Sequence, residues 1–429
     1  MSPSQAIAIR FIDLDRPITV MEDVTAFRRA RIFVTQGGDL IGSVDIENTF
    51  APISATRLSD AIAAGLWFQM TRRKAELHSA SQGKPALSSD VGVSIVIPSC
   101  NRPDDLRRCL ESIETQRGAR PLEVIVIDNR PGPASPTAAV ARAFERVTLL
   151  EEHRPGLSYA RNAGFAVASG AIAIAIDDDV TVPAGWLERL VAPFARPEVM
   201  AVTGHVLPIE LDTPSQVLFE AYGGLGKGFE AFERDGEWFR SRRVAVPTWL
   251  IGATANAAFR ASIFSDPRIG MLDEALGAGM PTGCSEDTYL FYRILKAGGT
   301  IAYQPTAWVW HRHRRELPAL RRQIYAYSKG HIAYHLTTLL REGDARALIR
   351  FFYSLPRTYV RRAWERLRGY SDYPLSLIAL EIAGCFAGPW ALWQARRRVR
   401  RLGAGARRPA VTGPVPENQI SAAGMARPA

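Results

Sequence analysis

The amino-acid sequence predicts an α/β fold built on a mainly parallel sheet with flanking helices. From Val91 onward, short apolar runs alternate with segments of helical length, which predicts right-handed crossovers between parallel strands. Residues 171–176 form a wholly apolar run, typical of a strand buried on both faces. Three aspartates, Asp177, Asp178 and Asp179, follow it. Because open α/β sheets bind ligands at the carboxyl ends of their strands, these aspartates mark a predicted ligand site.

Local signals justify each element in order. Pro103 and Asp104 open the first helix, and Ser135 with Pro136 supplies an N-cap and an N1 proline for the second. Gly170 closes the third helix. Predicted strands therefore cover residues 93–98, 122–128, 147–152 and 171–176, and predicted helices cover 103–116, 136–146 and 157–169. Further along, residues 201–204 and 300–303 are predicted strands, and the glycine- and aromatic-rich residues 216–240 are predicted to form a mobile substrate loop.

Four regions divide the chain. Residues 1–88 are predicted to form a small α+β accessory module with a docking or packing role, containing a hairpin within residues 31–46 and a helix over 59–74. Residues 89–320 form the α/β domain, and residues 321–402 form a basic helical region. Residues 403–429, rich in glycine, proline, alanine and arginine, are predicted to be disordered.

The charge and the cysteines of the chain restrict its expected partners and cellular compartment. The chain of 429 residues carries a formal net charge of +10, and much of the arginine excess lies late in the chain. Its clustering beside the apolar residues 375–393 favours an anionic membrane surface over nucleic acid, for which no motif is present. The four cysteines lack metal-site spacing, and the first residues lack a signal-peptide pattern, so a cytoplasmic location is expected.

Residues 375–393 approach the length that spans a membrane. Glu381 and internal glycines argue against a spanning helix, so three interpretations stand: a spanning helix, an interfacial helix and a buried helix. The sequence favours the interfacial helix, with the arginines of residues 396–401 meeting anionic lipid on the cytoplasmic face.

The aspartate triplet predicts a cation site. Crowded carboxylates repel one another unless a cation offsets their charge. Ligation by carboxylate oxygens suits Mg²⁺ or Mn²⁺, and these ions usually hold the phosphates of a substrate. The alternative is a solvated acidic turn.

Six short motifs stand in order along the chain. They are Val-Ser-Ile-Val-Ile-Pro-Ser-Cys-Asn-Arg-Pro (93–103), Val-Ile-Asp-Asn (126–129), Ala-Arg-Asn-Ala-Gly (160–164), Ile-Asp-Asp-Asp-Val (176–180), Ser-Glu-Asp (285–287) and Trp-His-Arg-His-Arg (310–314). This series resembles that of family 2 glycosyltransferases over about residues 90–330. The resemblance implies a GT-A fold, which is Rossmann-like, and an inverting transfer of a sugar from a nucleoside-diphosphate sugar.

The resemblance also implies roles for particular residues. The donor nucleotide would be bound by Pro98, Ser99, Asn101, Arg102, Asp128, Arg161, Asp177 and Asp178. The alternatives are an ordinary turn for residues 98–102, a capping aspartate at 128 and a surface salt bridge for Arg161. Asp128 departs from the family pattern because Asn-Arg-Pro-Gly-Pro follows it, where serine and another aspartate are commoner.

The metal would be held by Asp179, Asp177 and His311, and Asp287, paired with Glu286, would be the general base. A capping pair at the start of a helix and a structural histidine are the alternatives. Gly223-Gly-Leu-Gly-Lys-Gly228 lacks the features of a phosphate-binding loop and is read instead as a lid. Residues 249–256 are read as lining the acceptor pocket or as core.

Together these features predict a metal-dependent glycosyltransferase that acts on a glycan or lipid-linked acceptor, in surface polysaccharide or glycolipid synthesis. It would lie in the cytoplasm or peripherally on the cytoplasmic face of the membrane. A nucleotidyltransferase on a similar sheet is the nearest rival, although residues 99–103 lack its glycine-rich basic signature. A non-catalytic glycan- or lipid-binding scaffold is the other.

Overall fold

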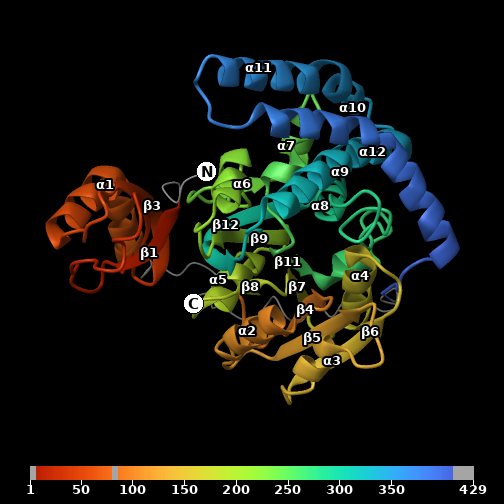
Figure 1. Cartoon of the computed structure of the whole chain (residues 1–429). Coiled ribbons are helices and arrows are strands. Elements are labelled where there is room, and N and C mark those ends of the chain that lie inside the picture. Colours follow the sequence, from red (N-terminus) through yellow and green to blue (C-terminus); the bar gives the residue numbers. More distant parts are fainter. Residues whose placement is uncertain (1–5, 80–85, 409–429) are drawn as a thin grey trace, which may run out of the picture.

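Two sheets and a layer of helices organise the chain (Figure 1). The structure is a computed structural model that describes residues 6–79 and 86–408. A three-stranded sheet lies in the N-terminal module, and a nine-stranded sheet forms the centre of the following domain. The predicted α/β class, with an α+β module before it and a helical region after it, is confirmed. The polar residues 79–85, which the sequence predicts to form a linker, lie outside the described residues except for Ser79.

The N-terminal module packs one helix against its sheet. Strand β2 (Arg29–Gln36) pairs antiparallel with β3 (Asp39–Glu47), as the predicted hairpin requires, and α1 (Ala55–Ser79) packs against β3. Strand β1 (Ile7–Asp13), which was not predicted, pairs parallel with β2. The module contacts the larger domain through Phe33, whose ring lies 5.8 Å from that of Trp310, and through a 2.6 Å ion pair between Asp39 and Arg189.

The large sheet is parallel in its first half and mixed in its second half. Strands β7, β4, β5 and β6 pair in parallel, whereas β11 runs antiparallel between β7 and β9. The expected parallel arrangement therefore describes only the half that holds the first motifs. In spatial order the strands are β10 (Phe232–Arg234), β12 (Thr300–His311), β9 (Val199–Pro208), β11 (Asn256–Arg260), β7 (Ile172–Ile176), β4 (Val93–Ser99), β5 (Leu122–Asn129) and β6 (Val147–Glu152), and β8 (Val180–Thr181) pairs with β12.

Helices cover both faces of this sheet, and two apolar clusters of buried side chains lie between the layers. The second predicted helix ends at Ala141, five residues earlier than expected. The helices of the domain are α2 (Pro103–Glu114), α3 (Pro136–Ala141), α4 (Leu157–Val167), α5 (Trp186–Val191), α6 (Pro214–Tyr222), α7 (Gly236–Ser241) and α8 (Glu286–Lys296).

The prediction of a mobile loop over residues 216–240 is wrong for most of this segment, which forms regular structure. Helix α6 occupies its start, because Thr213 and Gln216 form a capping box in front of Pro214. Strand β10 and helix α7 occupy its end, where Asp235 accepts a hydrogen bond from the Trp238 N–H and caps α7. The irregular part shrinks to the glycine-rich residues 223–231.

Strand β12 continues well beyond residue 303, where the sequence predicted its end. Its pairing with β9 shifts register between Gln304 and Trp308, and Pro305 lies in this bulge, a position that tolerates a residue without an N–H. At this bulge the buried Asn256 side chain bonds both strands. Its Nδ2 donates to the carbonyls of His205 and Ala307, at 3.0 and 2.7 Å.

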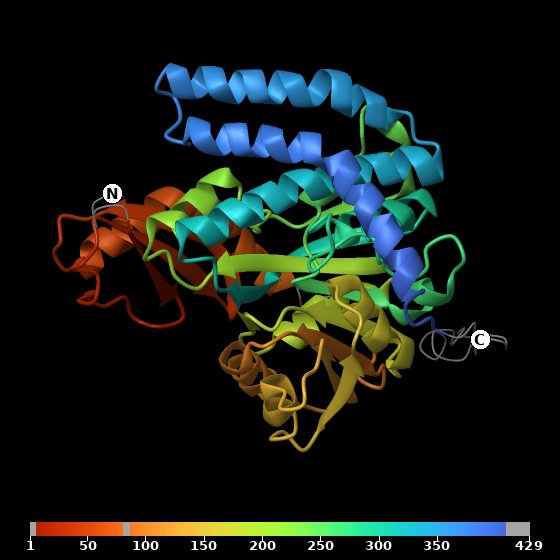
Figure 2. The same ribbon diagram turned by 45° about the vertical axis from the view of Figure 1, so that its right-hand side comes forward.

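Four C-terminal helices form a layer on one side of the domain (Figure 2). They are α9 (Leu317–Glu342), α10 (Arg346–Ile349), α11 (Leu355–Leu367) and α12 (Leu375–Leu402). Within the described residues, α12 is the one helix long and apolar enough to cross a membrane. It nevertheless packs along α9, where an added Cβ at Gly384 or Gly388 would come within 2.7 or 2.5 Å of α9 side chains. Glu381 is buried, and it accepts hydrogen bonds from Arg362 and Tyr373.

The predicted disorder is wrong for the first residues of the tail. The hydroxyl of Tyr159 donates to the Gly403 carbonyl at 2.8 Å, and Glu274 accepts from the Gly405 N–H and from Arg407. These partners hold residues 403–408 against the α/β domain, and residues 409–429 lie outside the described part.

We expect Asn256→Leu to lower the free energy of unfolding by about 3 kcal/mol, because two buried carbonyls and the Trp186 indole would lose their hydrogen bonds. Urea unfolding of both proteins measures this difference. A variant with unchanged stability would show that Asn256 does not hold the strands together.

Candidate active site

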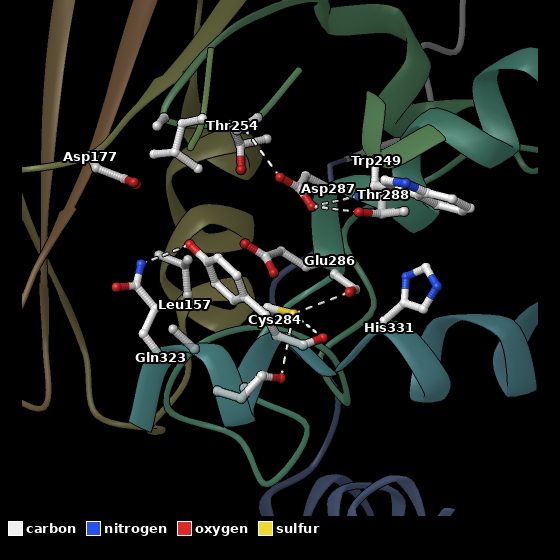
Figure 3. A pocket seen from close by; sticks show the side chains of 18 of the residues that line it. Leu157, Asp177, Trp249, Thr254, Cys284, Glu286, Asp287, Thr288, Gln323 and His331 are labelled. Atoms are coloured by element: carbon white, nitrogen blue, oxygen red, sulfur yellow. Dashed lines mark hydrogen bonds between the residues drawn. The ribbon is translucent and has the colours of Figure 1, made fainter. Parts of the chain in front are cut away.

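One large cavity opens at the carboxyl ends of the parallel strands. Its volume is about 1140 Å³, and it extends from the turn after β4 to the C-terminal helices. The Asp177–Asp179 triplet and the Glu286-Asp287 pair both line it, although more than a hundred residues separate them. Figure 3 shows Asp177, Glu286 and Asp287 around the same space. The structure therefore brings together the two acidic motifs that the sequence places far apart.

Arg161 joins the two motifs directly. Its side chain on α4 is only 1% exposed. One guanidinium nitrogen lies 2.6 Å from Asp177 Oδ1, and the other lies 2.9 Å from Glu286 Oε1 and donates to Thr254 Oγ1 at 2.7 Å. A buried cation shared by two carboxylates fixes their separation, because losing it would leave both charges unpaired. The surface salt bridge considered for Arg161 is excluded.

The Glu286-Asp287 pair begins helix α8, where the helix dipole favours negative charge. Asp287 accepts hydrogen bonds from the Thr288 N–H at 2.6 Å, the Thr288 hydroxyl at 3.1 Å and the Thr254 N–H at 3.4 Å. Burial, reinforced by the charge of Asp287, raises the pKa of Glu286 to about 7. The two acids therefore differ in environment: Glu286 is buried against Arg161, whereas Asp287 is partly exposed to the cavity.

A candidate metal site lies between the aspartate triplet and the end of β12. The β8–β12 pairing sets His311 opposite Val180. Asp177, Asp179 and His311 each offer one ligand atom, and these atoms all lie within 4.8 Å of one another. Asp179 Oδ1 is buried and has no hydrogen-bond partner in the described part of the chain, and His311 Nε2 lies 3.4 Å from it.

Burial lowers the pKa of His311, which favours the neutral imidazole that metals bind. Carboxylate oxygens with one neutral imidazole suit a divalent ion such as Mg²⁺ or Mn²⁺. The orphaned oxygen of Asp179 and this donor set therefore fit such an ion.

Asp178 points away from this cluster and holds the turn after β4. It accepts hydrogen bonds from Ser99 Oγ at 2.8 Å and from Arg102 at 3.2 Å, and Arg102 also bonds Asp179 at 2.8 Å. Burial raises the pKa of Asp178 to about 7 despite these partners. Pro98, Ser99 and Arg102 line the cavity, as the predicted nucleotide site requires.

Two predicted nucleotide-binding residues do not line the cavity. Asn101 is exposed, with a backbone φ of 55°. The Asp128 carboxylate is buried and accepts a hydrogen bond from Ser135, which caps helix α3. Asp128 therefore bonds the N-cap residue of α3 and does not itself cap a helix, which differs from the capping alternative considered from the sequence. The neighbouring Asn129 lines the cavity instead, and its amide bonds the carbonyls of Glu152 and Arg154.

Some cavity residues come from segments that the sequence assigned only as a whole. Thr254 lies within residues 249–256, which were read as lining the acceptor pocket or as core, and it contacts both Arg161 and Asp287. Lys227 belongs to the glycine-rich segment; burial lowers its pKa, and the charge of Asp287 opposes that shift. The lone lysine among the glycines was the available signal. Trp249 lines the cavity and also packs against His331, with ring centroids 4.7 Å apart.

The chain is similar to several known proteins. Residues 94–266 match the family model described as Glycosyl transferase family 2. Over 239 residues the chain is 30% identical to the pre-mycofactocin glycosyltransferase of Mycobacterium tuberculosis (strain CDC 1551 / Oshkosh), covering 54% of this chain and 45% of that protein. Over 238 residues it is 26% identical to the succinoglycan biosynthesis protein ExoO of Rhizobium meliloti (strain 1021), covering 53% and 62%.

The chain thus spans about half the length of these relatives. Among solved structures, it is similar to the mannosyltransferase PcManGT from Pyrobaculum calidifontis in complex with GDP-Man and Mn²⁺. The identity is 19%, the TM-score is 0.47, and the match covers 76% of this chain and 94% of that one.

We expect Glu286→Gln to change how stability depends on pH. The pKa of Glu286 rises from 4.5 to about 7 in the folded protein, so its ionisation favours the unfolded state. The stability that its proton supplies is complete below the unfolded pKa and is lost as pH rises through about 7. Glutamine does not ionise, so the variant should gain about 2 kcal/mol relative to the parent between about pH 5 and pH 8.

Denaturant titrations at several pH values measure this trend, and Glu188→Gln serves as the control. The hydrogen bond from Arg120 lowers the pKa of Glu188 from 4.5, so its replacement should cost a constant amount between about pH 5 and pH 8, and less only as pH falls below that range. A difference between Glu286→Gln and the parent that stays constant with pH would contradict the raised pKa.

Proposed function

We propose that this chain, whose residues 94–266 match the family model described as Glycosyl transferase family 2, is a metal-dependent, inverting glycosyltransferase. It transfers a sugar from a nucleoside-diphosphate sugar to an acceptor hydroxyl. The observation that carries the proposal is the meeting of two acidic motifs in one cavity, where Arg161 bonds both Asp177 and Glu286.

The donor lies at the strand end of the cavity. Pro98, Ser99 and Arg102 face it from the turn after β4, and Asn129 faces it from β5. Asp177, Asp179 and His311 would hold a divalent ion, Mg²⁺ or Mn²⁺. When bound, this ion supplies positive charge that neutralises the developing negative charge on the diphosphate leaving group.

Asp287 activates the acceptor. Its carboxylate takes the proton from the acceptor hydroxyl as that oxygen forms a bond to the anomeric carbon, and the bond from that carbon to the diphosphate oxygen breaks. Attack opposite the leaving group inverts the configuration. The N–H groups of Thr254 and Thr288 hold the carboxylate in place, while Arg161 fixes Glu286 behind it. Pre-set geometry of this kind lowers the barrier because no reorganisation is needed.

A membrane surface is the proposed location of the acceptor. Phe386, Trp390 and Trp393 lie on one stripe of α12 and are 83%, 60% and 47% exposed. The exposed Arg397 and Arg400 continue this stripe at helical spacing, while the opposite face packs on α9. Aromatic side chains followed by arginines suit an interfacial helix on anionic lipid. We infer that α12 lies on the membrane rather than crossing it.

A lipid-linked glycan on the cytoplasmic face is therefore the proposed acceptor class. The cavity continues from Asp287 to side chains of the C-terminal helices, among them Arg350, Tyr359 and Arg362. The similarity to a protein of succinoglycan biosynthesis supports a role in surface polysaccharide or glycolipid synthesis.

We expect Asp287→Asn to lower turnover by about a thousandfold, because the amide accepts no proton from the acceptor. A thermal-shift panel of UDP-, GDP- and dTDP-sugars with Mn²⁺ first identifies the donor. Release of the nucleoside diphosphate from that donor then measures turnover. Asp266→Asn is the matched control, since this carboxylate bonds Arg268 outside the cavity. Turnover within a few-fold of the parent would contradict the assigned base.

We expect replacement of Phe386, Trp390 and Trp393 by serine to reduce binding to vesicles that contain anionic lipid by about tenfold or more. Cosedimentation with phosphatidylglycerol vesicles measures this binding. Trp67→Ser with Phe68→Ser, an exposed aromatic pair on α1, is the control and should bind as the parent does. Equal loss in both variants, or no binding by the parent, would contradict the proposed surface.

A further inference from the structure

The N-terminal module reaches the candidate metal site through a chain of polar side chains. Arg31 on β2 is clamped by Asp45 on β3, with Nε and one terminal nitrogen 2.7 and 2.9 Å from the two carboxylate oxygens. Its other terminal nitrogen lies 3.4 Å from Glu220 Oε2 on α6. Arg31 thus leaves its own module and contacts the α/β domain.

Glu220 connects Arg31 to His313, which in turn contacts the proposed metal ligand His311. Its Oε1 atom lies 2.9 Å from Nε2 of His313, whose side chain is fully buried. Nδ1 of His313 lies 3.1 Å from Nδ1 of His311, and Nε2 of His311 faces Asp179 at 3.4 Å. The chain of contacts therefore runs without a gap from the module to the cation site.

The direction of these hydrogen bonds follows from Glu220. A carboxylate only accepts, so His313 donates through Nε2, and when its ring carries a single proton its Nδ1 accepts. His311 must then donate from its own Nδ1, which leaves its Nε2 as a bare lone pair. This nitrogen faces the orphaned oxygen of Asp179. The chain thus selects the one neutral tautomer of His311 that binds a cation at this position.

Arg31 is not needed merely to attach the module. Arg189 already binds Asp39 and the Gly38 carbonyl, and the rings of Phe11 and Phe33 pack on Trp310. Arg31 instead orients the Glu220 carboxylate beside the buried His313 side chain. The close fit at Gly224, where an added Cβ would come within 2.6 Å of Glu220 Oε1, keeps the carboxylate in the same place from the other side.

We propose that Arg31 is a positioning residue for His311, so that the N-terminal module tunes the affinity of the site for a divalent cation. This inference rests on the proposed metal-dependent function. It gives a role in the chemistry to a module in which the sequence shows no motif. Arg31 does not line the cavity, so its effect on the metal site passes through Glu220 and His313.

The test is a titration of the full chain with Mn²⁺ alone, followed by electron paramagnetic resonance of the free ion. Arg31→Met should weaken Mn²⁺ binding by about tenfold, the lower end of the range for residues behind a metal ligand. Arg29→Met is the matched control. Arg29 lies on the same strand and bonds Glu47 on β3 through Nε and one terminal nitrogen, but within the described residues it forms no hydrogen bond or ion pair with the α/β domain. It should bind Mn²⁺ within about twofold of the parent.

Glu220→Gln provides a second variant, which leaves the module untouched. The amide offers Arg31 neither a charge nor a second acceptor oxygen, so the group that accepts from His313 is no longer held in place, and Mn²⁺ binding should weaken as it does in Arg31→Met. If the two residues act in one chain, the double variant should bind Mn²⁺ no more weakly than the weaker single variant. Nitrogen-15 spectra of the histidines add a second readout, since His311 should carry its proton on Nδ1 in the parent protein.

The possible outcomes separate the two claims. A parent protein that does not bind Mn²⁺ overturns the metal-dependent function and this inference with it. A parent that binds Mn²⁺, with Arg31→Met binding equally well or with additive effects in the double variant, overturns this inference alone. If Arg31→Met shows no thermal transition, and so does not fold, Mn²⁺ binding by Glu220→Gln is compared with that of the parent instead. Unchanged Mn²⁺ binding in Glu220→Gln would also overturn this inference.

Discussion

The arrangement of the cavity depends on one buried cation. Arg161 extends from α4 to the end of β7, to the start of α8 and to the loop at Thr254, and it bonds a side chain in each. The antiparallel pairing of β7 with β11 holds Asp177 near Thr254, but no backbone ladder joins either of them to α8. Without the guanidinium, two half-buried or buried carboxylates would repel each other and the motifs would separate. The position of Asp287, one residue beyond Glu286, follows from this anchor, and so does the position of the aspartate triplet relative to it.

The carboxylates in the cavity outnumber the arginines that bond them. Asp177, Asp178, Asp179, Glu286 and Asp287 line it, and the arginines bonded to them in the described part of the chain are Arg102 and Arg161. The pKa values of Asp178 and Glu286 rise to about 7, as burial makes their charge costly. The proposed divalent ion between Asp179 and His311 would offset part of the remaining charge, beside the Asp179 oxygen that has no hydrogen-bond partner within the described residues. Lys227 and Arg314 also line the cavity without a hydrogen bond to these carboxylates, and a cavity with such a concentration of charge is expected to bind an ion and a phosphate.

The sequence predicted what depends on local pattern and missed what depends on packing between distant segments. Buried strands such as β4, β5 and β7 are short apolar runs, so their ends, and with them Asp177 and Asp179, could be placed in advance. The helix start at Glu286 was equally visible. The sequence could not show that Asp128 accepts a hydrogen bond from Ser135. An aspartate at the end of a strand can bond a neighbouring turn or bind a ligand, and the residue type is the same in both cases. Nor could the sequence show that Arg31 approaches Glu220, because contacts between separate modules leave no periodic signal. The extension of β12 past Pro305 was hidden by a bulge that reads as a strand end.

The central claim is that one cavity holds a cation-bound donor between the aspartate triplet and Asp287. Crystals of the full chain grown with Mn²⁺ and the nucleoside diphosphate that stabilises it most, measured at the manganese absorption edge, test this claim directly. The account predicts an anomalous peak within about 2.3 Å of Asp179 and of His311 Nε2, with the diphosphate beside it and facing Asp287. A manganese ion bound elsewhere, or a nucleotide outside this cavity, would contradict it.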